Sequence, residues 1–252
     1  MTNAHDSGSI VQLFTKRMEM AVSTDPGMSM TPHERTPAGS GPPAQGLYDP
    51  AHEHDACGVG FVVDIKGRKS HAIVSQALTV LINLLHRGAC GCEVNTGDGA
   101  GILLQMPDKF LRKACAGLGI ALPGPKDYGA GLVFLPRDAG ERDAVRARIA
   151  TIVAEEGQRL LGWRPVPTDD HLLGASAVSV EPVIEQVFIG RGAGVPDHDH
   201  FERKLYVVRK RIEHAIAAMD LADKALTYLP SLSSNTLIYK GCLLYTSDAA
   251  DE

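Results

Sequence analysis

The spacing of apolar residues divides the chain into strands and helices from about residue 57 onward. Residues 47–65, "LYDPAHEHDACGVGFVVDI", pass from turn-forming residues into a short apolar run typical of a buried strand. Apolar residues then recur at i, i+4, i+7 and i+11 from Val74, which places them on one face of a helix. Gly88 supplies a helix stop, so this helix is predicted to end there.

The rest of the chain continues as a mixture of the two patterns. The predicted strands are 102–106, 130–136, 178–189 with a break at Pro182, and 236–241; the predicted helices are 107 to 117 or 119, 138–156 and 201–219. Strands and helices do not alternate in a strict βαβ rhythm. The pattern therefore predicts a layered α+β domain.

The first part of the chain has a different character. Residues 1–45 show no sustained period, and "TPHERTPAGSGPPAQG" at 31–46 is dense in Pro, Gly, Ser and Thr. Such a segment cannot bury enough apolar surface to become ordered. We expect residues 1–56 to form a disordered leader or propeptide.

The composition limits the binding partners and the cellular location that the sequence predicts. The 252 residues carry a formal net charge of -5, spread along the chain, so the sequence predicts neither a nucleic-acid nor a membrane partner. No apolar run reaches the ~18 residues of a membrane helix, and no secretory signal is present. The five cysteines are an odd number without an export signal. We therefore expect a cytoplasmic protein without a disulfide framework.

Cys57 allows two interpretations. It lies between the small residues Ala56 and Gly58, and a free cysteine in such a context is commonly a small buried hydrophobe. However, the predicted leader ends beside it. A nucleophile whose own α-amino group acts as its base must become the first residue by cleavage. An α-amine has a pKa of about 8, suited to accepting a thiol proton.

Three ordered motifs carry a family resemblance. "DACGVGF", "LLHRGACG" and "TGDGAGILLQMPDKF" resemble the start of the large (alpha) subunit of glutamate synthases, a class II glutamine amidotransferase domain. The resemblance covers about residues 47–241. It implies a four-layer αββα N-terminal-nucleophile (Ntn) hydrolase fold, of which residues 57–241 form a C-terminally incomplete part.

The resemblance also assigns roles at the site. It implies cleavage between Ala56 and Cys57, after which Cys57 attacks the side-chain amide of L-glutamine and releases ammonia. It gives Arg87 a role in organising the active site, where a plain helix-capping role is the alternative. Asp98, in the glycine-rich loop, is a possible contributor, and a tight connection is the alternative for that loop.

Cofactors and further partners follow only from the resemblance. It implies FMN and a 3Fe-4S cluster in the larger enzyme, a small NADPH-oxidising subunit that carries FAD, and no cofactor or metal in this part. Cys90 and Cys92 lack a partner pair at zinc spacing. His198 and His200 fit a solvated first helical turn better than a ligand pair.

Two segments that the resemblance leads one to expect after residue 241 do not occur. They are "HSRFSTN", with the arginine that holds the glutamine carboxylate, and "HNGE", with the oxyanion hole. We therefore expect this chain alone to be inactive. Residues 242–252, "CLLYTSDAADE", resemble translated sequencing adapter and are expected to lie outside the fold.

Other functions stay open on the sequence. Another class II amidotransferase, similar to asparagine synthetase or to the phosphoribosyl-pyrophosphate enzyme, would share the cysteine and the Arg-Gly pair. A non-catalytic binding or assembly module is the alternative from a different class.

Overall fold

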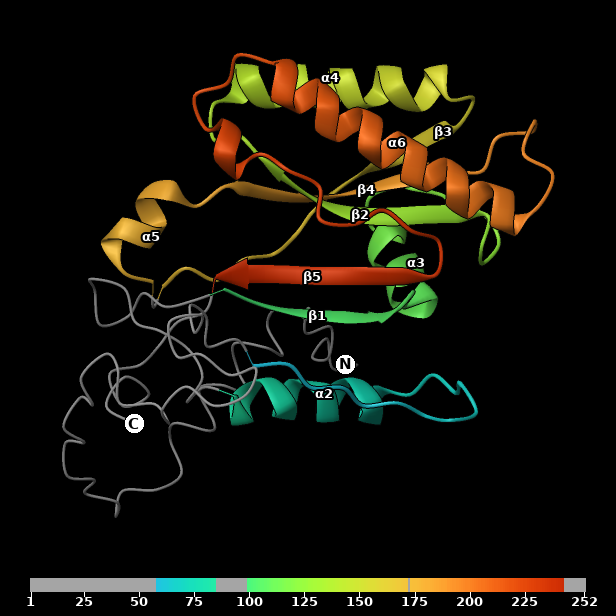
Figure 1. Cartoon of the computed structure of the whole chain (residues 1–252), viewed down its shortest axis with the longest axis vertical. Coiled ribbons are helices and arrows are strands. Elements are labelled where there is room, and N and C mark those ends of the chain that lie inside the picture. The colour runs from blue at the N-terminus through green and yellow to red at the C-terminus, as the bar shows by residue number, and fades with distance from the viewer. Residues whose placement is uncertain (1–57, 85–98, 172, 243–252) are drawn as a thin grey trace, which may run out of the picture. The chain divides into compact units, whose positions relative to one another are not determined.

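The computed structural model describes residues 58–84, 99–171 and 173–242 (Figure 1). Contacts group these residues into two compact units. The larger unit comprises residues 101–168 and 179–240, and the smaller one comprises the other described residues. Each unit is considered by itself below. No helix in the described part is both long and apolar enough to cross a bilayer.

A three-stranded antiparallel sheet forms the centre of the larger unit. Its strands are β2 (Tyr128–Leu135), β3 (Arg159–Pro165) and β4 (Val183–Gly190), in the order β2-β4-β3. Single bridges from Ser233 to Ala130 and from Tyr228 to Phe134 cover the free edge of β2. All eight residues of β2 are buried, so the sheet must be covered on both faces.

Two long helices cover one face of this sheet (Figure 1). They are α4 (Ala139–Glu155), capped by the Asp138 carboxylate, and α6 (His198–Ala218), capped by that of Asp197. Each carboxylate accepts a backbone N–H of the first turn, a group that otherwise lacks a partner. The main core lies between the helices and the sheet, and it includes Val133, Leu135, Val145, Ile149, Ile152, Val187, Ile189, Phe201, Leu205, Val208 and Ile212.

Helix α3 (Asp108–Ala116) packs on the opposite face of the sheet (Figure 1). The Tyr128 hydroxyl donates a 3.0 Å hydrogen bond to the Asp108 carboxylate, which joins the first turn of α3 to β2. Below α3, β1 (Gly99–Gln105) pairs with β5 (Thr236–Cys242). The larger unit is thus layered as two helices, a sheet, and then α3 with a second sheet.

The smaller unit contains α2 (His71–Asn83), which begins where the Ser70 hydroxyl accepts the Ile73 N–H at 3.3 Å. The predicted helix is confirmed, with Leu78 buried. Its end is not confirmed, because α2 stops at Asn83 and Gly88 lies outside the described residues.

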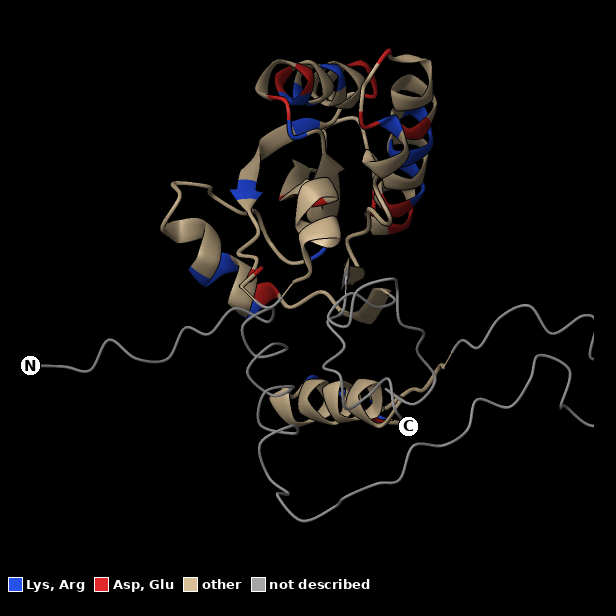
Figure 2. Ribbon diagram, turned by 90° about the vertical axis from the view of Figure 1, so that its left-hand side faces the viewer, with Lys and Arg blue, Asp and Glu red and all other residues tan. Residues whose placement is uncertain are grey.

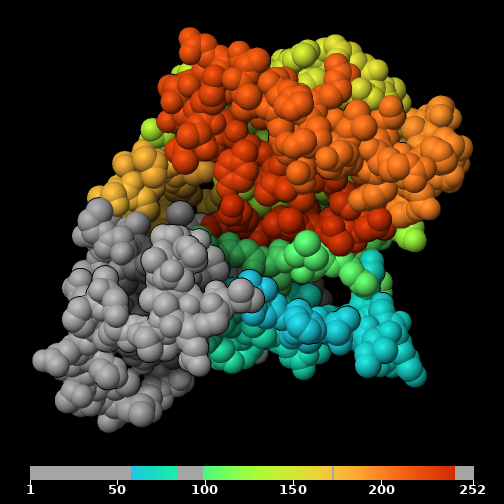
Figure 3. Space-filling view, viewed as in Figure 1, coloured from blue at the N-terminus to red at the C-terminus, as the bar shows by residue number. Residues whose placement is uncertain are grey.

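The buried strand predicted at the start of the domain is wrong for residues 58–65. None of the described strands includes this segment, and Val59 and Phe61 are 90% and 88% exposed. Figure 3 shows the segment, in light blue, on the surface. A strand forms only where a neighbouring strand pairs with it, and no described residue does so here.

Two further predictions need correction. The strand expected at 178–189 begins only at Val183; before Pro182 the chain forms the short helix α5 (Ala175–Val180). Strand β3 was not predicted at all. Its sequence "RLLGWRP" lacks period-two alternation. The strand contains a bulge between Leu160 and Gly162, and a bulge interrupts the alternation of side chains between the two faces of a sheet.

Basic and acidic residues are interspersed along α4 and α6 (Figure 2). Glu156, the C-cap residue that follows α4, accepts hydrogen bonds from Lys204 Nζ and Arg211 Nη1 of α6 at 2.8 Å each. Hydrogen bonds from Lys204 and then Arg211 hold the pKa of Glu156 below its ordinary value of 4.5. These bonds join the two helices across the top of the core.

Glu156 is therefore expected to make the stability pH-dependent. Its folded pKa lies below the unfolded value, so its contribution is complete above pH 4.5 and is lost as the pH falls through the folded pKa. We expect Glu156→Gln to flatten the acid limb of a urea-unfolding series measured against pH. Asp143→Asn, at a 77% exposed side chain, is the control and should leave that limb unchanged. An equal effect of both variants would contradict the assignment.

Candidate functional site

The residues predicted for the active site lie outside the described residues. They are Ala56, Cys57, Arg87 and Asp98, and His86, Cys90 and Cys92 lie in the same undescribed ranges. The structure does describe their neighbours: Gly58 follows Cys57, Leu84 precedes Arg87 by three residues, and Gly99 follows Asp98.

Two of these neighbours meet within the smaller unit. A Cβ atom added to Gly58 would lie 2.9 Å from Leu84 Cδ2, and one added to Gly60 would meet the Val80 side chain one turn earlier on α2. The chain after Cys57 therefore runs against the C-terminal half of α2. Only glycine permits so close an approach without displacing the leucine. The structure thus places Gly58, the residue after Cys57, beside Leu84, which precedes Arg87 by three residues.

The glycine-rich loop leads directly into β1. Gly101 Cα lies so close to β5 that an added Cβ would be 3.0 Å from the Tyr239 carbonyl oxygen, and one on Gly99 would be 3.3 Å from that of Gly241. The Met106 N–H donates to the Asn235 carbonyl at 2.7 Å, so β1 and β5 run antiparallel. The backbone that follows Asp98 is therefore positioned by β5.

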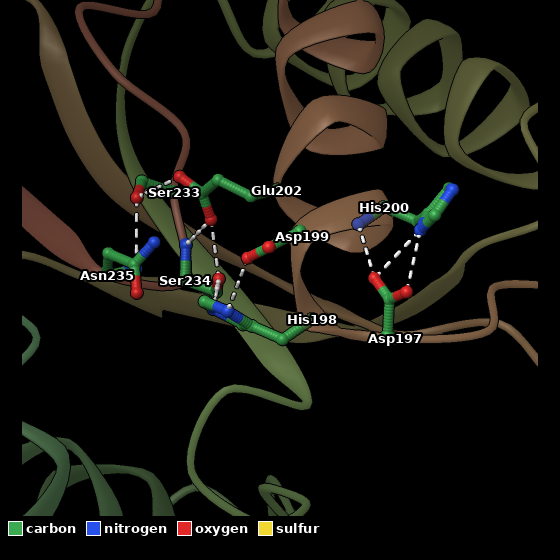
Figure 4. Close-up of polar contacts among 8 residues, drawn as sticks. All are labelled: Asp197, His198, Asp199, His200, Glu202, Ser233, Ser234 and Asn235. Atoms are coloured by element: carbon green, nitrogen blue, oxygen red, sulfur yellow. Dashed lines mark hydrogen bonds and ion pairs between the residues drawn. The ribbon is translucent and has the colours of Figure 1, made fainter.

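The turn before β5 contains a polar cluster that sequence reasoning missed (Figure 4). Glu202 of α6 accepts the Ser233 hydroxyl at 2.5 Å, and it accepts the backbone N–H and the hydroxyl of Ser234 at 2.9 and 2.5 Å. The Ser233 oxygen in turn accepts the N–H groups of Asn235 and Thr236. The available signal was the run "SLSSNT" immediately before a predicted strand, since serines stabilise turns through such bonds.

Ser234 of this cluster, together with His198 and Asp199 of α6, has the order of a catalytic triad. His198 Nε2 lies 3.0 Å from the Ser234 hydroxyl oxygen, and His198 Nδ1 lies 3.5 Å from the Asp199 carboxylate. The single Ser234 proton, however, points to Glu202, so His198 must donate to this oxygen. Ser234 is also only 2% exposed. A nucleophile needs the opposite proton direction and access to substrate, so this cluster is structural.

The cluster connects α6 to the start of β5. Glu202 holds the turn at 233–236, β5 begins at Thr236, and β5 pairs with β1. His200, by contrast, only bonds the Asp197 carboxylate in an exposed first turn, as expected from the sequence. Among the described residues no group of three or more His, Cys, Asp or Glu side chains is placed to hold a metal ion.

Comparison with known proteins identifies the family to which the chain belongs. The family described as "Glutamine amidotransferases class-II" matches residues 57–249, more than half of the chain, and the match begins at Cys57. The chain belongs to the class II glutamine amidotransferase family. The family resemblance inferred from the three motifs is confirmed, as is a mixed fold of helices and sheets.

Similar proteins include several glutamate synthases. The chain is 43% identical over 217 residues to "Glutamate synthase [NADPH] large chain" of Bacillus subtilis, a match that covers 84% of this chain and 14% of that one. It is 43% identical over 213 residues to "Glutamate synthase [NADH]" of Schizosaccharomyces pombe, covering 82% and 10%. For "Ferredoxin-dependent glutamate synthase 2, chloroplastic" of Arabidopsis thaliana the identity is 38% over 197 residues, covering 78% and 12%.

The chain thus spans about a seventh or less of the length of these relatives. It corresponds to part of their amidotransferase domain. The boundaries predicted at 56 and 241 stay predictions: β5 includes Cys242, and residues 243–252 lie outside the described part.

Proposed function

We propose that Cys57, once exposed as the N-terminal residue by cleavage after Ala56, is the nucleophile of a glutaminase reaction. The observation that carries this proposal is the family match, which begins at Cys57 itself. The approach of Gly58 to Leu84 supports it, because these two described residues stand one position after Cys57 and three positions before Arg87 in the sequence.

The reaction needs one base and one acid, and a terminal cysteine supplies both. The free α-amine accepts the thiol proton, and the sulfur attacks the amide carbon of the glutamine side chain. The tetrahedral intermediate collapses with loss of ammonia, which takes the proton back from the amine. Water then hydrolyses the γ-glutamyl thioester to glutamate and frees the thiol. In the uncleaved chain the amine is part of a peptide bond, so the base is missing.

Arg87 and Asp98 have supporting roles in this proposal. A guanidinium can hold several acceptors in a fixed plane, which suits Arg87 for ordering loops around the cysteine. Asp98 directly precedes Gly99 in the sequence, and Gly99 is the first residue of β1, the strand that pairs with β5. The four-layer αββα arrangement belongs to the same proposal; it is supported by the sheet that α4 and α6 cover and by the second sheet, β1-β5.

The wider function follows from the relatives. We infer that the ammonia serves the synthesis of glutamate from 2-oxoglutarate in a cytoplasmic glutamate synthase, whose FMN, 3Fe-4S cluster and FAD-containing NADPH-oxidising subunit lie beyond this domain. The relatives are named for NADPH, NADH and ferredoxin alike, so similarity does not select the electron donor.

A diazo-ketone analogue of glutamine tests the nucleophile and the cleavage together. This reagent alkylates the cysteine that attacks the glutamine amide. In the active complete gene product, mass spectrometry is expected to find one adduct, on a peptide that begins at Cys57. An adduct on another residue would contradict the nucleophile assignment. Active enzyme that retains residues 1–56 would contradict the cleavage.

A further inference from the structure

Four exposed apolar side chains stand at alternate positions just after Cys57. They are Val59, Phe61, Val63 and Ile65, here called the apolar row, and they are 68% to 99% exposed. No other segment of the described chain gathers as many exposed large hydrophobic side chains. Single exposed hydrophobic residues are ordinary, but a contiguous set of them marks a surface that another part of a protein covers.

The glycines that alternate with the row face α2. A Cβ atom added to Gly60 would lie 2.4 Å from Val80 Cγ1, and one added to Gly58 would lie 2.9 Å from Leu84 Cδ2. Successive side chains of an extended segment point to opposite sides. Helix α2 therefore covers one side of this segment and leaves the apolar row on the other side, where Figure 3 shows it in light blue.

The predicted leader contains one apolar segment that matches such a surface. It is residues 10–22, "IVQLFTKRMEMAV", whereas residues 31–46 include no large hydrophobic side chain. A segment within a polar, disordered chain becomes ordered only when it binds a surface that accepts its apolar residues. Those residues are Ile10, Val11, Leu13, Phe14, Met18, Met20 and Val22.

The leader also joins the chain directly before the apolar row. Residues 23–57, 35 in number, separate the apolar segment from Gly58. A random coil of that length spans about 30 Å, and the row itself is at most about 20 Å long, so the segment can reach all of it. Such a tether gives an effective concentration of about 1 mM. A second copy of the chain at micromolar concentration competes poorly with a segment held in this way.

We propose that residues 10–22 cover the apolar row in the uncleaved chain. The contact buries the four side chains beside the Cys57 segment. Cutting the chain after Ala56 breaks the tether, so the segment falls from about millimolar effective concentration to that of a free peptide, and the row is released. One cleavage thus frees both the α-amine of Cys57 and the surface beside it. The release rests on the proposed function, whereas the contact itself does not.

A photoreactive side chain in the row tests the contact. Benzoyl-phenylalanine is placed at position 61, where the native side chain is 88% exposed, in the 252-residue chain that intact mass shows to retain its leader. Irradiation is expected to link position 61 to residues 10–22, as mass spectrometry of the linked peptides would show. Links to another segment, links between two chains, or the lack of any link would each overturn the proposal.

Two leader variants show whether the apolar side chains carry the contact. Phe14→Asp places a charge within the segment and is expected to lower the yield of the link about five-fold or more, because burying an unpaired charge is unfavourable. Met28→Asp adds the same charge outside the segment and should leave the yield unchanged. Equal yields in the two variants would overturn the proposal. The readout needs neither cleavage nor glutaminase activity, so its outcome is separate from that of the proposed nucleophile.

Discussion

Replacing Cys57 with alanine in the complete gene product is expected to reduce glutamine hydrolysis by about 10⁴-fold or more, the scale on which loss of a catalytic nucleophile acts. Alanine removes the sulfur that is proposed to form the thioester. If ammonia is supplied from solution, synthesis of glutamate at the distant site should continue. The measurement is ammonia release from glutamine beside ammonia-dependent glutamate formation.

Cys115→Ala is the matched control for this variant. Cys115 lies fully buried in α3, and burial raises the pKa of its thiol, so it is inert as a nucleophile. Its replacement should leave glutamine hydrolysis within a few-fold of the unmodified enzyme. Retained glutaminase activity in Cys57→Ala, or its loss in Cys115→Ala, would refute the proposed nucleophile.

Glu202→Ala is expected to lower the free energy of unfolding by about 3 kcal/mol, because three donors around the turn at 233–236 lose a charged acceptor. Ser233 and Ser234 are buried, so water cannot readily replace the carboxylate. Urea unfolding followed by the fluorescence of Trp163, the single tryptophan, measures this change. Amide exchange in β5 should accelerate most, since the turn fixes its first residue.

Two further variants separate the role of the carboxylate from general damage to a helix. Glu202→Gln keeps one acceptor oxygen but places an amide donor against the donors of Ser234, so an intermediate loss is expected. Glu155→Ala removes a carboxylate with a 43% exposed side chain from α4 and should change stability by less than about 1 kcal/mol. Equal losses for Glu202→Ala and Glu155→Ala would show that the cluster does not hold the turn.

Much of the larger unit could be predicted from local pattern. Helices α4 and α6 have a buried stripe at helical spacing, so their type could be predicted from the sequence. The start of α4 was predicted to within one residue, whereas α6 begins at His198, three residues before the predicted start at 201. Strands β2, β4 and β5 could also be predicted, because each contains a short run of apolar residues. The sequence pattern did not predict β3, which contains a bulge, and it predicted a strand where residues Ala175–Val180 form α5.

The site was predictable only through motif resemblance. Ala56, Cys57, Arg87 and Asp98 stand in recognisable motifs, but their side chains lie outside the described residues, and their roles stay predictions. The cluster around Glu202 had no such signal, because 31 and 32 residues separate Glu202 from the two serines that it holds. Only folding brings a residue of α6 to the turn before β5.

The sequence by itself determined the family, the amphipathic helices and the candidate nucleophile, because motifs and periodicity are written in neighbouring residues. The tertiary structure decided which polar groups meet. It directed the Ser234 proton to Glu202, which excludes a serine nucleophile, and it left the apolar row after Cys57 exposed. Proton direction and exposure depend on contacts across the fold, which no local pattern contains.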